Sequence, residues 1–395
     1  MINVSFIVVN YFSEALTWKC LRSIREKTQG ISYEVIVVDN HSGLDIQKGK
    51  FLFPTVQFVV SDKNLGYGMA CNLGATKAAA EFFYFLNNDT ELVTDVASIL
   101  YSFAKQNPKI GLLGAQLVDA QKKPSISFDY FPTLSSKLFG IGLLRFFNPE
   151  KFPKKEALKQ PTRVDLVSGS SLFVSADAFK KIGGFDPQFF LYCEEEDLAL
   201  RLTQAGYEVW SHPEAVLMHI GGGSSSNKLL LKREFYISFF KFYRKHYGLF
   251  KTGLLRLLCL NQFVIKSISG NEKALWRFLL RWLLTGASEK DGLRFQSGNI
   301  DGPLTKSSSN KLMGALIILG LLFSFDLSLQ ASLEKNDPLL PAIQTFQQGQ
   351  IQEALSLFLT ILKTDPKNKA AHDYVNLIAQ QLLIDQKNES PKRSA

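Results

Sequence analysis

Short apolar runs alternate with longer segments of helical character over the first 117 residues. Apolar runs bounded by polar turn residues predict buried strands at Val4–Val9, Glu34–Val38, Val56–Val60, Phe82–Leu86 and Ile110–Ala115. The segments between them predict helices, one opening at Ser13 and Glu14 and two covering Tyr67–Ala80 and Thr94–Gln106. This alternation predicts an α/β domain, with a largely parallel sheet and helices on both of its faces.

The pattern weakens after this part of the chain and then returns. Residues 119–163 are rich in Pro, Lys and Phe, and we expect them to form an irregular loop over the site. Regular structure is expected again at Asp165–Val174. A strong helix is predicted over Glu194–Ala205, where Gly206 ends it.

The C-terminal part has a different character. Residues 298–311 are a polar linker, and residues 312–331 contain the unbroken apolar run Leu312–Phe325. This run is short for a membrane span of roughly 20 residues, so a membrane anchor and a buried helix are both open. If residues 312–331 span, the lysines before them keep residues 1–311 cytoplasmic and place the tail outside.

The tail, residues 332–395, resembles a single tetratricopeptide repeat. It contains Phe346-Gln-Gln-Gly349, then Ala354 four positions before Phe358, and then Pro366. Because one repeat cannot bury its own apolar face, we expect the helical tail to belong to an array or to bind a protein partner.

Charge is concentrated in one segment. The chain of 395 residues carries a net charge of +9, and residues 226–297 alone hold fourteen Lys or Arg against four acids. These basic residues are interleaved with Trp, Phe and Leu, as in amphipathic helices that lie on an anionic membrane. We assign residues 251–297 this role, with an ordinary helical layer that packs its apolar faces inward as the alternative. No nucleic-acid-binding motif accompanies the charge, so no nucleic acid partner is expected.

The overall composition excludes several classes of protein. With 46% hydrophobic and 21% charged residues, the chain is foldable and not disordered. Its four cysteines are far apart in the sequence and have neither metal-type nor redox-type spacing. They therefore indicate a reducing compartment and no disulfide framework.

Two acidic residues follow predicted strands directly. Asp39 comes after Glu34–Val38, and Asp89 comes after Phe82–Leu86 and two asparagines. Ligands of open α/β sheets bind at the carboxyl ends of the strands, so both carboxylates are expected at one edge. Together they could place a nucleotide and a divalent cation side by side.

Several motifs in fixed order carry a family resemblance. They are Val8-Val9-Asn10-Tyr11, Val37-Val38-Asp39-Asn40-His41-Ser42, Asn64-Leu65-Gly66-Tyr67-Gly68 with Asn72 and Gly74, Leu86-Asn87-Asn88-Asp89-Thr90, Gly169-Ser170, Gly184-Phe185-Asp186, Glu194-Glu195-Glu196-Asp197-Leu198 with Arg201, and His219. Residues 1–250 thereby resemble a family 2 glycosyltransferase with the GT-A fold, a Rossmann-like mixed sheet flanked by helices. The resemblance is to the rhamnosyltransferase-like members.

The resemblance implies a dTDP- or UDP-linked nucleotide-diphospho-sugar as donor and Mg²⁺ or Mn²⁺ as cofactor. It assigns the metal to Asp89 and His219, and the imide of the base to Asp39. The glycines Gly66 and Gly68 would let backbone N–H groups approach a phosphate or base. The remaining residues implied at the donor site are Asn10, Asn40, Asn64, Asn72, Asn87 and Asn88. Local alternatives are a helix cap for Asp89, a turn residue for Asp39, and close packing for the glycines.

The four acids from Glu194 to Asp197 are expected to activate the acceptor. The family base aligns with Glu195, and Glu194 is the neighbouring candidate for the same role. An ordinary acidic first turn of a helix is the alternative. Asp197 and Arg201 lie four positions apart and are expected to form an ion pair.

These expectations describe an inverting, metal-dependent glycosyltransferase of cell-surface glycan synthesis. It would act at the cytoplasmic face of a bacterial inner membrane, on a lipid-linked or glycan acceptor. The alternative is a non-catalytic scaffold of a glycan assembly complex that combines a GT-A domain with the repeat-like tail. A nucleotidyltransferase is disfavoured, because Phe6–Tyr11 lacks a glycine-rich phosphate loop.

Overall fold

The computed structural model describes residues 2–149, 152, 158–220, 228–269, 272–284, 292–295 and 351–366, and the single positions 339, 341, 342, 345, 368, 371, 372 and 375. The chain divides into two compact units. The first contains residues 1–255 and 288–304, and the second contains residues 256–287 and 305–395.

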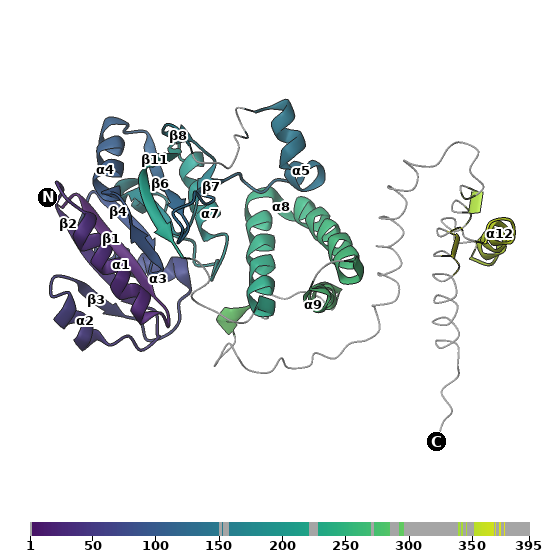
Figure 1. Cartoon of the computed structure of the whole chain (residues 1–395), viewed down its shortest axis with the longest axis horizontal. Coiled ribbons are helices and arrows are strands. Elements are labelled where there is room, and N and C mark those ends of the chain that lie inside the picture. Colours follow the sequence, from purple (N-terminus) through teal and green to yellow (C-terminus); the bar gives the residue numbers. More distant parts are fainter. Residues whose placement is uncertain are drawn as a thin grey trace, which may run out of the picture. The chain divides into compact units, whose positions relative to one another are not determined.

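The first unit is built on one large sheet (Figure 1). Its strands are β1 (Val4–Asn10), β2 (Tyr33–Asp39), β3 (Gln57–Val60), β4 (Phe82–Asn87), β5 (Thr90–Leu92), β6 (Ile110–Val118), β8 (Thr162–Arg163), β10 (Ser171–Ser175) and β11 (Glu208–His219). The short strands β7 (Phe128–Asp129) and β9 (Leu166–Val167) form a separate pair.

The sheet has the order β3-β2-β1-β4-β10-β6-β11-β5, and β8 pairs with β11. The first four of these strands are parallel, and β6 is parallel to β11. Strand β10 lies antiparallel between β4 and β6, and β5 is antiparallel to β11. The result is the mixed α/β sheet flanked by helices that the resemblance implied. The parallel arrangement read from the alternation pattern holds for the first four strands and for the β6–β11 pair.

Helices cover both faces of the sheet. They are α1 (Glu14–Lys27), α2 (Ile46–Leu52), α3 (Tyr67–Ala75), α4 (Val96–Gln106), α6 (Ala176–Lys181) and α7 (Glu194–Gln204). Along β1, Phe6 and Val8 point into a core that includes residues of α1 and α4. Ile7 points to the opposite face, where the core includes residues of α3, α6 and α7. Successive side chains of a strand point to opposite faces of the sheet. Each apolar strand is therefore packed against helices on both faces.

The structure corrects the expectation for residues 119–163. This segment contains helix α5 (Leu134–Phe147), which has a non-helical residue at Gly140. Thr133 caps the helix, because its side chain accepts from Ser136 N while the Ser136 hydroxyl accepts from Thr133 N. Helix α3 is also shorter than expected and ends at Ala75, whereas β6 continues to Val118.

A long helix, α8 (Lys228–Ser269), runs from the first unit into the second and has a non-helical residue at Gly248. Within the described part of the chain, it alone is long and apolar enough to cross a membrane, by length and composition only. This evidence is weak, because side chains in its first half bind the core of the first unit, as shown below.

In the second unit, helix α9 (Lys273–Leu284) turns its apolar stripe inward. Leu275, Trp276, Leu279 and Trp282 are buried, and the Trp276 ring lies 5.6 Å from that of Phe263 in α8. Lys266 lies 4.3 Å above the Trp276 ring. This arrangement of α9 agrees with the alternative interpretation, a helical layer that packs its apolar face inward. Only the basic face of α9 is then left to contact a membrane.

The predicted linker and apolar segment, residues 298–331, lie outside the described residues. In the tail, α12 (Ile351–Thr364) buries Ala354, Phe358 and Ile361. The small and large residues that suggested a repeat therefore do lie on a buried face. The repeat itself remains a prediction.

Candidate active site

A cavity of about 440 Å³ opens in the first unit at the carboxyl ends of β1, β2 and β4. Nine of the predicted site residues line it: Asn40, Asn64, Gly66, Asn87, Asn88, Asp89, Glu194, Glu195 and His219. Its wall also includes aromatic and small residues, among them Tyr11, Tyr67, Ser168, Gly169, Phe190 and Tyr192. The sequence predicted a ligand site at the edge of the sheet that carries Asp39 and Asp89. The cavity lies at this edge.

Asp89 and His219 meet at this edge. In the antiparallel pairing of β5 with β11, Thr90 lies opposite His219, which brings the preceding Asp89 beside the imidazole. The Oδ1 atom of Asp89 lies 3.3 Å from Nε2 of His219, and both side chains are partly exposed to the cavity. No helix begins after Asp89, since β5 follows directly, so the cap alternative for this aspartate is wrong. A carboxylate oxygen and an imidazole nitrogen are suitable ligands for a divalent cation.

Asn10 lies behind the cavity and is only 1% exposed. Its Nδ2 donates to Asp39 Oδ1 (3.1 Å) and to the Ser42 hydroxyl (2.8 Å). Its Oδ1 accepts from Thr17 Oγ1 at 2.7 Å and from Asn88 Nδ2 at 3.3 Å. Asn10 therefore joins the ends of β1, β2 and β4 instead of lining the donor space as expected.

Asp39 is similarly enclosed, with 2% of its surface exposed. Its two oxygens accept from the backbone N–H groups of Ser42, Gly43 and Leu44, at 3.1 to 3.4 Å, and from the Ser42 hydroxyl. The local alternative, a turn residue at a strand end, describes this geometry. An imide N–H of a base could be accepted only if one of these donors moved away.

The turn before α3 is held by two asparagines. Asn40 donates from Nδ2 to Asn64 Oδ1 (2.9 Å) and accepts from Leu65 N (2.8 Å), while Asn64 Oδ1 also accepts from Gly66 N (3.0 Å). Gly66 has φ +80°, and a Cβ there would lie 2.2 Å from the carbonyl oxygen of Phe190. That same oxygen accepts from Tyr67 N at 3.0 Å.

This geometry gives the glycines a packing role. The N–H groups of Leu65, Gly66 and Tyr67 donate to protein acceptors, and the missing side chain of Gly66 makes room for Phe190. A Cβ on Gly68 would meet Phe185 at 3.1 Å. Asn72 braces the same loop, because it donates to Phe185 O (2.8 Å) and accepts from Phe185 N (2.9 Å). Gly68 and Asn72 therefore shape the wall and do not line the cavity.

The acids at the start of α7 are delivered by an unusual turn. Tyr192 and Cys193 both have positive φ values, 69° and 63°, and such strained residues cluster at functional sites. Glu194 and Glu195 then line the cavity, and each keeps one buried oxygen, Oε2, without a hydrogen-bond partner. Burial raises the pKa of Glu195 above the ordinary value of 4.5. Burial and the Glu195 charge raise the pKa of Glu194 well above it.

A raised pKa is what a carboxylate needs to take a proton near neutral pH. Glu195 also contacts the neighbouring backbone, since a Cβ on Gly169 would lie 3.0 Å from its Oε1. The Gly169 carbonyl accepts from the Tyr67 hydroxyl at 3.1 Å. The candidate base is thus set against a fixed loop of small residues.

Asp197, the fourth of these acids, forms ion pairs with several basic side chains and has no exposed side-chain surface. It pairs with Arg201 (2.7 Å), as expected from their spacing, and also with Lys245 and with His246 (2.8 Å). Burial favours a higher pKa for Asp197, but the His246 hydrogen bond and the charges of Arg201 and Lys245 outweigh it and lower the pKa. Lys245 also binds Asp186 at 2.6 Å. Two residues of α8, which the sequence did not single out, therefore fix α7 in place.

A second cavity, also about 440 Å³, adjoins the first. The two share Ser168 and Glu195, and the second is walled mainly by aromatic and aliphatic side chains: Ile126, Phe128, Tyr130, Phe131, Ile141, Leu166, Val167, Phe235 and Phe239. Glu196 reaches it with a buried oxygen that lacks a partner, and its pKa is raised by burial and by Glu195. Glu195 thus lies in the wall that the two cavities share.

One wall of the first cavity comes from a distant part of the chain. The 3-10 turn η2 (Leu293–Phe295) places Leu293 in the wall, in an apolar cluster with Phe190 and Leu230. The Leu293 N–H donates to the buried carboxylate of Glu234 at 2.8 Å. No local sequence signal marks this contact, because it depends on a return of the chain to the first unit.

Comparisons with known proteins show what this chain is similar to. The family model for glycosyl transferase family 2 matches residues 5–183. Rhamnosyltransferase WbbL of Escherichia coli K12 is 27% identical over 225 residues, which cover 55% of this chain and 83% of that protein. The N-acetylglucosaminyl-diphospho-decaprenol L-rhamnosyltransferase of Mycobacterium tuberculosis H37Rv is 29% identical over 182 residues, or 42% of this chain and 59% of the relative.

A solved structure, GalNAc-T7 with UDP, GalNAc and Mn²⁺, aligns with a TM-score of 0.46 at 14% identity and covers 73% of this chain and 57% of its own. The low-salt glycan biosynthesis hexosyltransferase Agl10 of Haloferax volcanii is 27% identical over 212 residues, covering 52% of this chain and 64% of that protein. The family match covers the part of the first cavity up to Ser170 and ends before Glu194, Glu195 and His219. Residues 5–183 of this chain therefore match family 2 glycosyltransferases, and relatives named as rhamnosyltransferases are similar to this part of the chain.

Proposed function

We propose that the protein transfers a sugar, with inversion at the anomeric carbon, from a nucleotide-diphospho-sugar to a hydroxyl group of a lipid-linked or polysaccharide acceptor. One observation carries the proposal. The Asp89–His219 pair and the partly unpartnered carboxylate of Glu195 line one cavity at the carboxyl edge of the sheet. A metal-binding pair and a general base are the two functions that such a transfer requires.

The donor diphosphate would lie beside Asp89 and His219, which would hold Mg²⁺ or Mn²⁺. Among the described residues, no group of three His, Cys, Asp or Glu side chains could hold a metal by itself. A cation at this pair would thus leave coordination positions open for diphosphate oxygens. When bound, the cation supplies positive charge against the departing diphosphate.

The acceptor would be activated by Glu195. Its carboxylate takes the proton of the acceptor hydroxyl as the oxygen forms a bond to the anomeric carbon. The bond from that carbon to the diphosphate breaks at the same time, and the nucleoside diphosphate leaves with the electron pair. A raised pKa suits Glu195 for this role because its carboxylate then holds the proton more tightly.

The second cavity would receive the acceptor. It shares Glu195 with the donor space, and its aromatic walls suit the apolar faces of sugar rings. A mycobacterial relative is named for a rhamnose donor and a diphospho-decaprenol acceptor, and an Escherichia coli relative is named a rhamnosyltransferase. We therefore take rhamnose as the transferred sugar and a lipid-linked glycan as the acceptor.

The donor and the metal are tested by thermal unfolding of the full chain. A bound ligand stabilises the native state by about 2.7 kcal/mol at a hundredfold excess over its Kd. We expect dTDP-rhamnose to raise the unfolding temperature with Mg²⁺ or Mn²⁺ and much less with a chelator. UDP-sugars serve as competitors. Equal protection with and without metal would remove the cation from the proposal, and the anomeric configuration of the product, read by NMR, tests inversion.

A further inference from the structure

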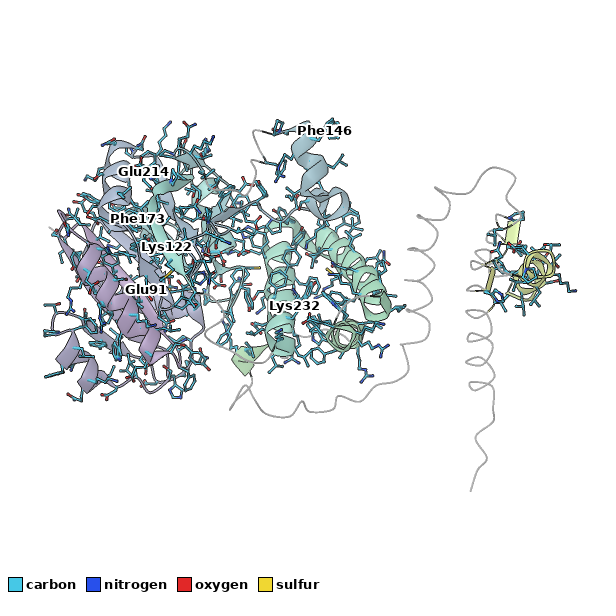
Figure 2. All side chains as sticks on the ribbon, viewed as in Figure 1. Glu91, Lys122, Phe146, Phe173, Glu214 and Lys232 are labelled. Carbon is cyan, nitrogen blue, oxygen red and sulfur yellow. The ribbon has the colours of Figure 1, made fainter. Side chains whose placement is uncertain are left out.

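Helix α5 exposes an apolar surface that the fold leaves uncovered. None of its side chains that the structure describes is buried, and Phe146 and Phe147 are 80% and 75% exposed. Their rings contact each other at 5.3 Å, and Leu138 and Leu143 are also exposed on the same helix. Figure 2 shows Phe146 at the outer end of α5. Gathered apolar side chains of this size mark an interaction surface.

Helix α5 is anchored at its first turn, at the end opposite to the exposed Phe146 and Phe147. The capping box at Thr133 fixes its first turn, and Lys137 lies 4.9 Å above the ring of Phe239. Ser136, Lys137 and Ile141 line the second cavity beside Phe235 and Phe239 of α8. At the far end, Arg145 donates to the carbonyl of Phe152 at 2.8 Å. The phenylalanines are therefore held outward by structure at both ends.

The charge around α5 indicates which partner covers it. By sequence alone, residues 120–163 contain nine Lys or Arg and three acids, a net charge of +6, and exposed Lys122 and Lys123 precede the helix, whereas Arg163 pairs with Glu208 in the large sheet. Two copies of the chain meeting through α5 would place two such segments against each other, which is unfavourable. An anionic bilayer instead offers both an apolar layer for the rings and negative head groups for the lysines.

Helix α9 is also basic, but unlike α5 it buries much of its apolar surface. Four of the large apolar residues of α9 are buried in the second unit and the others are half-buried, so its inward face is already covered. In the first unit, α5 combines exposed aromatic rings, a basic surrounding segment and direct contact with the second cavity. Ile126, which is 60% exposed, also lines that cavity.

We propose that α5 inserts Phe146 and Phe147 into the interfacial layer of an anionic membrane. Resting on the function proposed above, this insertion holds the second cavity at the lipid surface, within reach of the head of a lipid-linked acceptor. Recognition of the lipid surface is by charge and apolar insertion, so any sufficiently anionic bilayer serves.

The insertion is tested on the full chain by a fluorophore at a single position. The four native cysteines are buried, so a label sensitive to polarity can be directed to F147C. F51C is the matched control, because Phe51 of α2 is 85% exposed and also lies beside lysines. With vesicles of phosphatidylglycerol and phosphatidylcholine, we expect a blue shift at position 147 and quenching by lipids brominated in their acyl chains. The label at position 51 should keep its emission in water.

Three results would overturn the proposal. One is a chain that does not sediment with the anionic vesicles. Another is a chain that sediments while the label at position 147 stays in water, which would assign binding to α8, α9 or the tail. The third is a blue shift that grows with protein concentration without vesicles, which would make α5 a contact between copies. None of these readouts needs transfer activity, so they stand even if the proposed function fails.

A second pair of variants connects insertion with turnover. F146S/F147S should weaken partition onto anionic vesicles by about tenfold or more, whereas F51S should not. Transfer to an acceptor embedded in vesicles should fall by a similar factor, and transfer to a short water-soluble analogue should be unchanged. Equal losses with both acceptors would show that the double variant damages the site, and would refute the positioning role of α5.

Discussion

The carboxylate of Asp89 and the imidazole of His219 lie 3.3 Å apart, brought together by the pairing of β5 with β11. Contacts between sequence neighbours do not set this distance, because the two residues are far apart in the chain. Asp89 is fixed by the end of β4, and His219 is fixed by the last residue of a strand that begins at Glu208. Their separation therefore depends on the register of the sheet, and a shift of one residue would turn one side chain to the other face.

D89N should abolish transfer and metal-dependent donor binding while the fold survives. A neutral amide has nearly the same shape as the carboxylate but supplies no negative charge for a cation. Turnover and metal-dependent thermal protection are the measurements, and D62N, at an exposed aspartate, is the matched control. Unchanged turnover of D89N at saturating metal would exclude Asp89 from the site.

E195Q should lower turnover by roughly 10²–10⁴-fold with donor affinity largely retained, because the amide cannot accept the acceptor proton. E194Q carries the same change one position earlier, at a residue that lines the same cavity. The pair therefore reports which carboxylate is the base. A loss confined to E194Q would transfer that role to Glu194.

The pH profile should reflect the raised pKa of Glu195. Burial raises this pKa above 4.5, and the carboxylate acts as a base only when it is deprotonated. The value of kcat/KM should therefore rise with pH through an apparent pKa above 4.5 and reach its plateau on the alkaline side. This acidic limb should disappear in E195Q, whose residual activity no longer titrates there. A limb centred below 4.5 in the native enzyme would contradict the assignment.

D197N should destabilise the protein by about 3–5 kcal/mol in urea unfolding, because it leaves the positive charges around a buried position uncompensated. The affected partners are Arg201, Lys245 and His246. E208Q, which breaks the largely exposed pair with Arg163, is the control and should cost less than about 1 kcal/mol. Similar losses in the two variants would show that the Asp197 cluster is not a structural centre.

G66A should be more damaging than G30A, although both glycines have left-handed backbones, with φ of +80° and +72°. At Gly30 the new methyl group meets nothing within 4 Å, so only the conformational cost of about 1–2 kcal/mol applies. At Gly66 it would lie 2.2 Å from the Phe190 carbonyl oxygen, which adds steric strain of about 1–3 kcal/mol. Unfolding free energies and donor binding measure the difference, and equal costs at the two sites would contradict the packing role.

Strands β1, β2, β3, β4 and β6 could be predicted because each is a short apolar run with a clear polar boundary. The antiparallel position of β10 could not, because the alternation pattern carries no information on strand direction. Helix α5 escaped prediction for a local reason, since it contains Gly140 and Gly142 and has no polar face at helical spacing. Its cap and its contacts with α8 supply the stability that the pattern lacks.

The first cavity was predictable in outline, because many of its residues directly follow the ends of strands. Asp39 and the motif glycines were assigned to the ligand. In this structure Asp39 and Gly68 lie outside the lining of the first cavity, and Gly66 both lines it and makes room for Phe190, because a motif does not reveal whether a group already has a protein partner. Lys245 and His246 lie on α8, and nothing in their local sequence indicates that they would meet Asp197. The second cavity likewise joins residues near 130 with residues near 237.

The contact of Leu293 with Phe190 and Leu230 has a consequence for biosynthesis. A ribosome releases the whole sheet, the Asp89–His219 pair and Glu195 before it adds the residue that completes the wall. A nascent chain can therefore fold its α/β core early, as N-terminal parts generally do, while its donor cavity still lacks one side. The cavity closes only after residues 256–287 have been made, which links the appearance of a finished site to the synthesis of the first segment of the second unit.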